Sequence, residues 1–205
     1  MEIDISKEPA KTSSKKTTKI QNYLLLEIIG KGAFSKVFKG QNIKTKEYVA
    51  IKRINKDQLE ETIGPNYKDI VQRELSILIM LNSCKNVVQI KDWLNTSQHY
   101  YFVFEYLPGG DLAGYLKKRG RISEKQVKNI MKQIANGMKK LNELRIVHRD
   151  LKLSNFLITD DSEEPIVKIW DFGFAKQKDN LQESLMYETK CGTWINMAPE
   201  ILNGK

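Results

Sequence analysis

HRDLKLSN at residues 148–155, followed by DFG at residues 171–173, is the most informative part of this sequence. Asp150 in the first stretch is a candidate general base, since a carboxylate can accept the proton of a hydroxyl group. Asn155 and Asp171 carry hard oxygen atoms, which are the ligands that Mg²⁺ prefers. If these residues were ordinary loop and capping charges, their joint spacing would have no explanation. The two stretches therefore predict a catalytic centre.

A glycine-rich turn lies upstream, between two strand candidates. GKGAFSKV at residues 30–37 fits the phosphate-holding pattern G-x-G-x-x-G-x-V, except that Ser35 replaces the third glycine. Glycine lets backbone N–H groups approach a phosphate, because no Cβ stands in the way. Alone, such a turn is more typical of an ordinary hairpin. The candidate nucleotide-binding residues in it are Gly30, Lys31, Gly32, Ala33, Phe34, Ser35 and Val37.

The next candidate is a lysine at the end of an apolar strand. VAIK at residues 49–52 places Lys52 downstream of the glycine turn, where a cation can meet phosphates. Such a lysine needs a carboxylate to hold it. Glu74, in an expected helix, is the preferred partner, and Glu60 and Glu61 in a more polar region are the alternatives.

The pattern of apolar residues predicts a strand-rich half followed by a helix-rich half. We expect strands over residues 23–29, 37–39, 48–52, 87–92, 100–106, 156–159 and 166–170, and helices over 67–82, 112–118 and 123–144. A polar loop is expected between the third strand and the first helix. Ser123 and Gln126 suit a capping box at the start of the long helix.

Composition limits the class of protein. The chain has 205 residues and a formal net charge of +9, but its lysines are spread along the whole length, so we do not predict nucleic-acid binding. No apolar run is long enough to span a bilayer, and no secretory signal is visible. Cys84 and Cys191 do not make a disulfide framework. These features predict a cytoplasmic protein.

Residues from about 23 onward resemble the eukaryotic protein kinase domain. FEYLPGGDLAGYL at 104–116, and CGT at 191–193 before MAPEIL at 197–202, are similar to the ULK group of autophagy-initiating Ser/Thr kinases. The resemblance implies an α+β, bilobal fold, in which an antiparallel sheet and helix αC form the N-lobe. The C-lobe would be mainly helical and truncated after the A-P-E motif. The implied organisation is a disordered tail at 1–20, the N-lobe and hinge at 21–107, and a partial C-lobe at 108–205.

The resemblance implies ATP and Mg²⁺ as cofactors and assigns a role to each motif. Lys152 would steady the transferred phosphate beside Asp150, while Lys52 pairs with Glu74. His148 would pack against Phe172 and take no part in the chemistry. The implied base-binding residues are Val37, Ala50 and Leu157 around the ring, Phe104 as gatekeeper, Glu105 to Leu107 as hinge, and Asp111 near the ribose. A phosphate on Thr189 would pair with Arg149 and order the activation loop.

The departures from the family pattern are Ser35, Leu153 and the segment Trp194-Ile195-Asn196, which replaces the usual residues of the substrate pocket. The leading hypothesis is an ATP-dependent Ser/Thr protein kinase, incomplete at its C-terminus, that acts on protein substrates and meets regulatory partners. The alternative is a catalytically inactive nucleotide-binding or partner-binding module. The complete set of Lys52, Glu74, Asp150, Asn155 and Asp171 favours the kinase.

Overall fold

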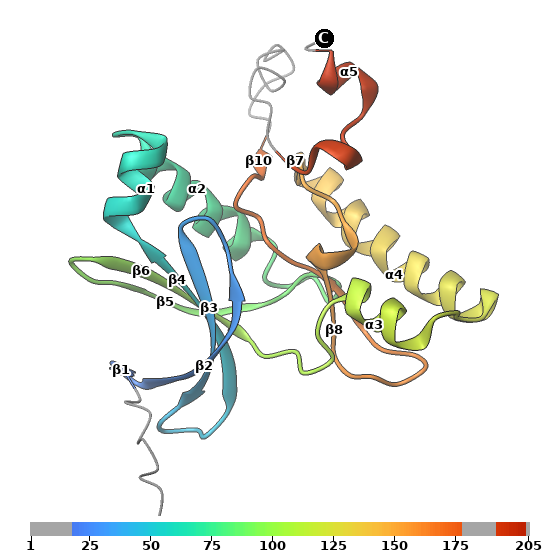
Figure 1. Ribbon diagram of the computed structural model, residues 1–205, viewed down its shortest axis with the longest axis horizontal. Coiled ribbons are helices and arrows are strands. Elements are labelled where there is room, and N and C mark those ends of the chain that lie inside the picture. The colour runs from blue at the N-terminus through green and yellow to red at the C-terminus, as the bar shows by residue number, and fades with distance from the viewer. Residues whose placement is uncertain (1–17, 178–191, 204–205) are drawn as a thin grey trace, which may run out of the picture.

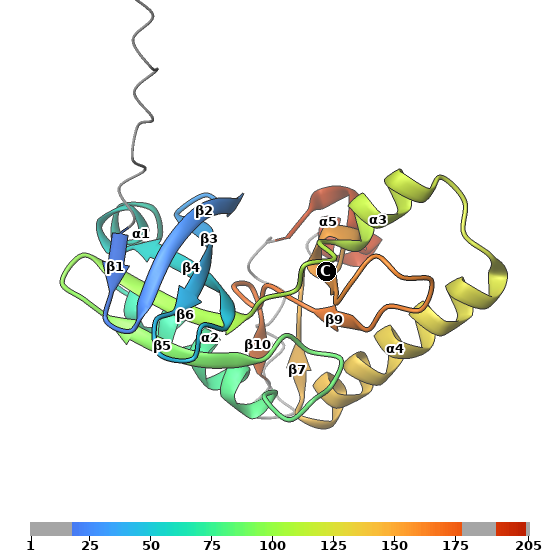
Figure 2. The ribbon, with the colours of Figure 1, turned by 90° about the horizontal axis from the view of Figure 1, so that it is seen from below.

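The computed structural model describes residues 18–177 and 192–203, which form a sheet-rich part and a helix-rich part joined by the chain after residue 105 (Figures 1 and 2). The first part is built on a six-stranded antiparallel sheet of order β1-β2-β3-β4-β6-β5. Its strands are β1 (Thr18–Ile20), β2 (Tyr23–Lys31), β3 (Ser35–Asn42), β4 (Tyr48–Asn55), β5 (Ile90–Asn95) and β6 (His99–Glu105).

Two helices accompany this sheet, α1 (Lys56–Ile63) and α2 (Tyr67–Met80). Helix α2 is the predicted one, and it buries its apolar face. Helix α1 stands where a polar loop was expected, so that prediction was wrong. Asn55 caps it by accepting a hydrogen bond from the backbone N–H of Gln58 at 2.9 Å, and Leu59 is its buried residue.

Two further sequence boundaries are corrected by the structure. Residues 18–20 were expected to belong to the disordered tail, but they pair with β2 as strand β1. The strand expected at 87–92 begins at Ile90. Val87 and Val88 instead pack in the core, where Val87 makes an isolated parallel bridge to Ile169.

The second part contains α3 (Leu112–Arg119) and the long helix α4 (Glu124–Glu143), as predicted. The Ser123–Gln126 capping box is confirmed at the start of α4. The other elements are β7 (Ile146–Val147), the 3₁₀ turn η1 (Leu153–Asn155), β8 (Phe156–Ile158), β9 (Val167–Ile169), β10 (Lys176–Gln177), η3 (Trp194–Asn196) and α5 (Pro199–Leu202). The β8–β9 and β7–β10 pairs are both antiparallel.

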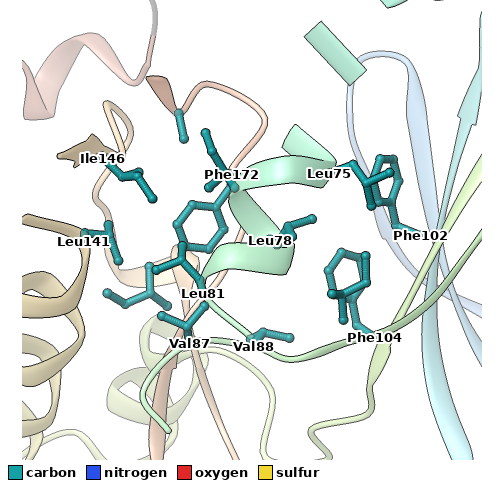
Figure 3. Packing of buried hydrophobic residues seen from close by; sticks show 14 of the residues in the cluster. Leu75, Leu78, Leu81, Val87, Val88, Phe102, Phe104, Leu141, Ile146 and Phe172 are labelled. Carbon is teal, nitrogen blue, oxygen red and sulfur yellow. The ribbon is translucent and has the colours of Figure 1, made fainter. Parts of the chain in front are cut away.

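One hydrophobic core joins the two parts (Figure 3). Leu75, Leu78 and Leu81 of α2 and the following turn lie between Phe102 of the sheet and Phe172. The stripe on α4 is only partly buried: Ile130 and Leu141 lie in the core, whereas Val127 and Met131 are 43% and 56% exposed. The predicted α+β, bilobal arrangement is therefore confirmed. None of the helices in the described ranges is long and apolar enough to cross a membrane.

Candidate active site

Lys52 stands at the centre of a buried charge cluster. It lies on β4 opposite Val37 of β3, and its side chain crosses to helix α2. Its Nζ is 2.7 Å from Glu74 Oε1 and 3.2 Å from Asp171 Oδ1. The structure thus pairs Lys52 with the preferred carboxylate, and Glu60 and Glu61 on α1 are not its partners. Three segments distant in sequence meet at this one cation.

The electrostatics of the cluster favour the charged forms of Lys52 and Asp171. Burial alone would lower the pKa of Lys52, but Glu74 and Asp171 outweigh it and raise that pKa above its usual value. In turn, the Lys52 ammonium holds the pKa of Asp171 below its usual range, although burial opposes this. A charged Asp171 is the form that could bind a cation.

Asp150 accepts hydrogen bonds on both carboxylate oxygens. Oδ1 takes the backbone N–H of Thr193 at 2.8 Å and its hydroxyl at 2.7 Å. Oδ2 lies 2.8 Å from Lys152 Nζ and 3.2 Å from Asn155 Nδ2. Burial raises the pKa of Asp150, but the bonds from Lys152 and Thr193 reverse this and leave it below its ordinary value. The carboxylate is therefore ionised and held in one orientation.

Asn155 is oriented by the same loop. Its Nδ2 donates to the backbone oxygen of Asp150 at 2.8 Å, so its Oδ1 remains the atom able to bind a metal ion. Within the described ranges, no cluster of three His, Cys, Asp or Glu side chains could hold a metal. A Mg²⁺ ion at Asn155 and Asp171 would therefore complete its shell with phosphate oxygens and water, as this ion usually does.

His148 packs against Phe172, as predicted. It is 1% exposed, and its ring meets Phe172 edge-on with the centroids 5.0 Å apart. Its Nε2 lies 3.0 Å from the backbone oxygen of Trp170, and burial lowers its pKa. Arg149 and Asp171 beside it have positive φ angles of 68° and 63°, a strained conformation typical of functional loops.

The glycine-rich turn is closed by its own serine. The N–H of Gly32 donates to the backbone oxygen of Ser35 at 2.8 Å, and a Cβ on Gly32 would lie 2.7 Å from Ser35 Oγ. A side chain at position 32 would therefore force the Ser35 hydroxyl to move. Gly30, Lys31, Ala33, Phe34 and Val37 lie on the same β2–turn–β3 segment.

The other expected base-binding residues border the junction between the two parts. Ala50 lies on β4 opposite Phe104 of β6, and Leu157 makes a bridge to Asp111. The carboxylate of Asp111 accepts the N–H of Gly114 at 2.8 Å, so one of its oxygens caps α3. Leu107 packs at the margin of the core.

Sequence reasoning missed Thr193, which places two hydrogen bonds on Asp150 and a third contact, of 3.0 Å, on Lys152. Gly192 makes this approach possible. Its φ is +103°, and a Cβ there would collide with the backbone oxygen of Arg149. The sequence signal was present in the CGT triplet, which was used only to identify the subgroup.

A partly buried ion pair was also missed. Lys168 Nζ on β9 lies 2.6 Å from Glu105 Oε1, with the two side chains 10% and 21% exposed. The same oxygen accepts the N–H of Gln89 at 2.8 Å. The side chain of Glu105 is thereby turned toward β9, while its backbone N–H donates to the backbone oxygen of Gln89 at 3.0 Å.

We expect Lys168→Met to lower the free energy of unfolding by about 2 kcal/mol, because Glu105 would remain partly buried without its cation. Glu105→Gln combined with Lys168→Met should recover part of this loss. Lys125→Met, which removes an exposed pair with Glu164, is the matched control and should cost less than about 1 kcal/mol. The free energy of unfolding is measured in urea for the wild-type protein, the two single variants and the double variant. Equal losses for Lys168→Met and Lys125→Met would contradict the argument.

Thr189 and Arg149 are the two residues predicted to regulate the enzyme. Thr189 lies outside the described residues, as does Cys191. Arg149 donates from Nε to the backbone oxygen of Phe174 at 2.6 Å, which ties the catalytic loop to the segment after DFG.

Comparison with known proteins agrees with this geometry. The family profile described as "Protein kinase domain" matches residues 23–205. The chain is 40% identical over 195 residues to "Serine/threonine-protein kinase atg1" of Dictyostelium discoideum, covering 91% of this chain and 28% of that protein. It is 35% identical to "Serine/threonine-protein kinase ATG1a" of Arabidopsis thaliana, with the same two shares. For "Serine/threonine-protein kinase unc-51" of Caenorhabditis elegans, the identity is 34% and the shares are 88% and 21%.

The chain thus spans little more than a quarter of the length of the first of these relatives. Its match to the kinase profile nevertheless covers most of its own residues, and the resemblance drawn from the sequence motifs is confirmed. The chain belongs to the protein kinase domain family, among relatives that are Ser/Thr protein kinases of the Atg1/ULK type.

Proposed function

We propose that this domain transfers the γ-phosphate of ATP, with Mg²⁺, to Ser or Thr hydroxyls of protein substrates. The observation that carries the proposal is the contact of Lys52 with both Glu74 and Asp171. That contact brings a phosphate-binding cation beside a candidate metal ligand. Transfer of a phosphoryl group requires mainly positioning and charge stabilisation, which such an arrangement can supply.

The proposed roles follow from the contacts of each side chain. Asp150 accepts the proton of the substrate hydroxyl, and Thr193 and Asn155 hold its carboxylate in place. Lys152, 2.8 Å from Asp150, balances negative charge at the site of transfer. Asn155 Oδ1 and Asp171 would hold Mg²⁺, which supplies neutralisation of phosphate charge when bound.

The base end of the nucleotide would lie between Ala50 and Leu157, against the backbone of Glu105 to Leu107. The phosphates would lie under the turn formed by residues 30–37, near Lys52. This placement is supported by the position of both groups at the junction of the two parts of the fold, where ligands commonly bind.

The test is transfer of labelled phosphate from γ-labelled ATP to otherwise identical peptides with Ser, Thr or Tyr as the single acceptor. We expect Mg²⁺-dependent labelling of the Ser and Thr peptides and its loss when the metal is removed with EDTA. The Asp150→Asn variant, purified in the same way, controls for a contaminating kinase. Labelling that is equal in that variant, or confined to the Tyr peptide, would contradict the proposal.

We extend the proposal to the setting of the protein. The names of the relatives support a role in autophagy, and the sequence supports a cytoplasmic location with regulatory protein partners. Residues 21–107 would form the N-lobe with its hinge, and residues 108–205 would belong to the C-lobe. Phosphate on Thr189, paired with Arg149, would be the activating signal.

A further inference from the structure

Three cations stand directly opposite one another on neighbouring strands of the six-stranded sheet. Lys31 at the end of β2 pairs in register with Lys36 of β3, and Lys36 pairs with Arg53 of β4. Residues in such opposed positions share a face of the sheet, and like charges there repel one another. Among the residues that the structure describes, none of the three forms an ion pair. The fold therefore carries a repulsion at this row that its own acidic residues do not relieve.

The row lies on the face of the sheet that points away from α2. Lys52, the residue before Arg53, sends its side chain to Glu74 of α2, and successive side chains of a strand alternate. Beyond Arg53, the next members of the row are Tyr101 and Leu94, which are 4% and 7% exposed. The two lysines at the other end are exposed. The row thus keeps its apolar half inside and presents its charged half to solvent.

The surroundings of Arg53 show that the positive charge extends beyond the row itself. Its guanidinium carbon lies 4.9 Å from the ring centroid of Phe38, so the charge rests on an aromatic ring and not on a carboxylate. His99 lies at the start of β6, the strand next to β4. Burial lowers the pKa of His99, and the charges of Arg53 and Lys56 lower it further, while Asp57 opposes them. The field of these cations therefore reaches the neighbouring strand.

An exposed apolar side chain lies beside the cations. Ile28 of β2 is 46% exposed and pairs with Phe38, two residues along β3 from Lys36, so it shares the face of the cations. The rings on this face, Phe38 and Tyr101, are 8% and 4% exposed and so are not available to stack on nucleic-acid bases. Cations next to an exposed aliphatic group match the surface of a bilayer, where anionic headgroups border the acyl chains.

We propose that Lys31, Lys36, Arg53 and Ile28 form a docking surface for an anionic lipid bilayer. The three cations attract the negatively charged headgroups, which also offset the repulsion within the row. Ile28 enters the boundary between the headgroups and the acyl chains. This inference goes beyond the proposed function and does not depend on it, because binding to lipid requires no phosphate transfer.

The test is sedimentation of the full chain with two kinds of vesicle, phosphatidylcholine alone and phosphatidylcholine mixed with phosphatidylserine. We expect binding to the mixed vesicles that weakens as salt is added. Each cation near such a surface raises affinity about fivefold, so Lys36→Gln should weaken binding about fivefold, and Lys31→Gln with Lys36→Gln about 25-fold. No binding by the wild-type protein, or equal binding to both kinds of vesicle, would overturn the inference.

Lys128→Gln with Lys132→Gln is the matched control, because it removes the same charge from two exposed lysines of α4. This variant should bind the mixed vesicles nearly as well as the wild-type protein. Thermal unfolding establishes that each variant is folded. If the control loses as much affinity as the variant of Lys31 and Lys36, net charge alone drives the binding and the proposed surface is wrong.

A second arm distinguishes a bilayer from an acidic protein segment, with fluorescent polyglutamate in place of the vesicles. Ile28→Ser keeps every charge, so it should weaken binding to the mixed vesicles severalfold and leave any binding of polyglutamate unchanged. Binding of polyglutamate without binding of vesicles would assign the surface to an acidic protein. That result, or an unchanged vesicle affinity in Ile28→Ser, would overturn the inference.

Discussion

Asp150→Asn is expected to lower kcat for peptide phosphorylation by about a thousandfold, within the range that a positioned base contributes. Asparagine keeps the size of the side chain and an oxygen that can accept the hydrogen bonds of Thr193. It removes the negative charge that accepts a proton and pairs with Lys152. The loss should therefore appear in the transfer step, while Kd for Mg²⁺·ADP should stay near the wild-type value.

The control for this prediction is Asp161→Asn, which makes the same change on the exposed turn where Asp161 pairs with Lys118. Exposed pairs contribute little, so both kcat and stability should be unaffected. Single-turnover measurement of labelled phosphate transfer separates the chemical step from product release. A tenfold or smaller loss in Asp150→Asn would show that the proton is accepted elsewhere.

The arrangement around Asp150 shows where motif-based prediction succeeded and where it stopped. Asp150, Asn155 and Asp171 could be named from spacing, because their motifs place fixed residue types in a short loop. Thr193 could not, since its bond to Asp150 spans 43 residues and depends on the backbone turn at Gly192. A threonine in a loop has no sequence pattern that reveals such a partner.

The same limit explains the missed ion pair and the missed helix. Lys168 and Glu105 lie 63 residues apart on two different strands, and a charged residue in a strand is usually on a solvated face. The sequence of α1, KDQLEETI, carries Leu59 as its single buried residue, so it lacks the apolar periodicity that identifies a helix. Its cap at Asn55, joined to the end of β4, was the remaining signal.

Lys52→Met is the second large prediction, with an expected loss of about a hundred- to a thousandfold in kcat/KM for ATP, the cost of removing one preorganised charge from a transition state. Unlike Asp150→Asn, it should also damage the fold. Lys52 and Glu74 are both buried, and breaking such a pair typically costs about 3–5 kcal/mol. The matched control is Lys91→Met, because Lys91 has the same 2.7 Å distance to Glu47 but is exposed. Lys91→Met should change neither kcat/KM for ATP nor the free energy of unfolding by a comparable amount.

The pH dependence of activity and stability in Lys52→Met shows whether the variant acts through the missing positive charge or through the changed shape of the side chain. In the wild-type protein, Lys52 is the main cause that holds the pKa of Asp171 below its usual value. A carboxylate with a depressed pKa stabilises the fold at pH values above its unfolded pKa, and this contribution is lost as the pH falls toward its folded pKa. Without Lys52, the carboxyl of Asp171 should gain its proton at a higher pH. The acid side of the profile of residual activity should therefore move to higher pH in Lys52→Met and remain unchanged in Lys91→Met. The loss of stability that Asp171 causes at acid pH should become smaller in Lys52→Met, because its folded pKa no longer lies far below its unfolded pKa. If the acid side of the activity profile does not move in Lys52→Met, Lys52 does not control the charge of Asp171. That result would contradict the proposed coupling between the phosphate-binding lysine and the metal-binding aspartate.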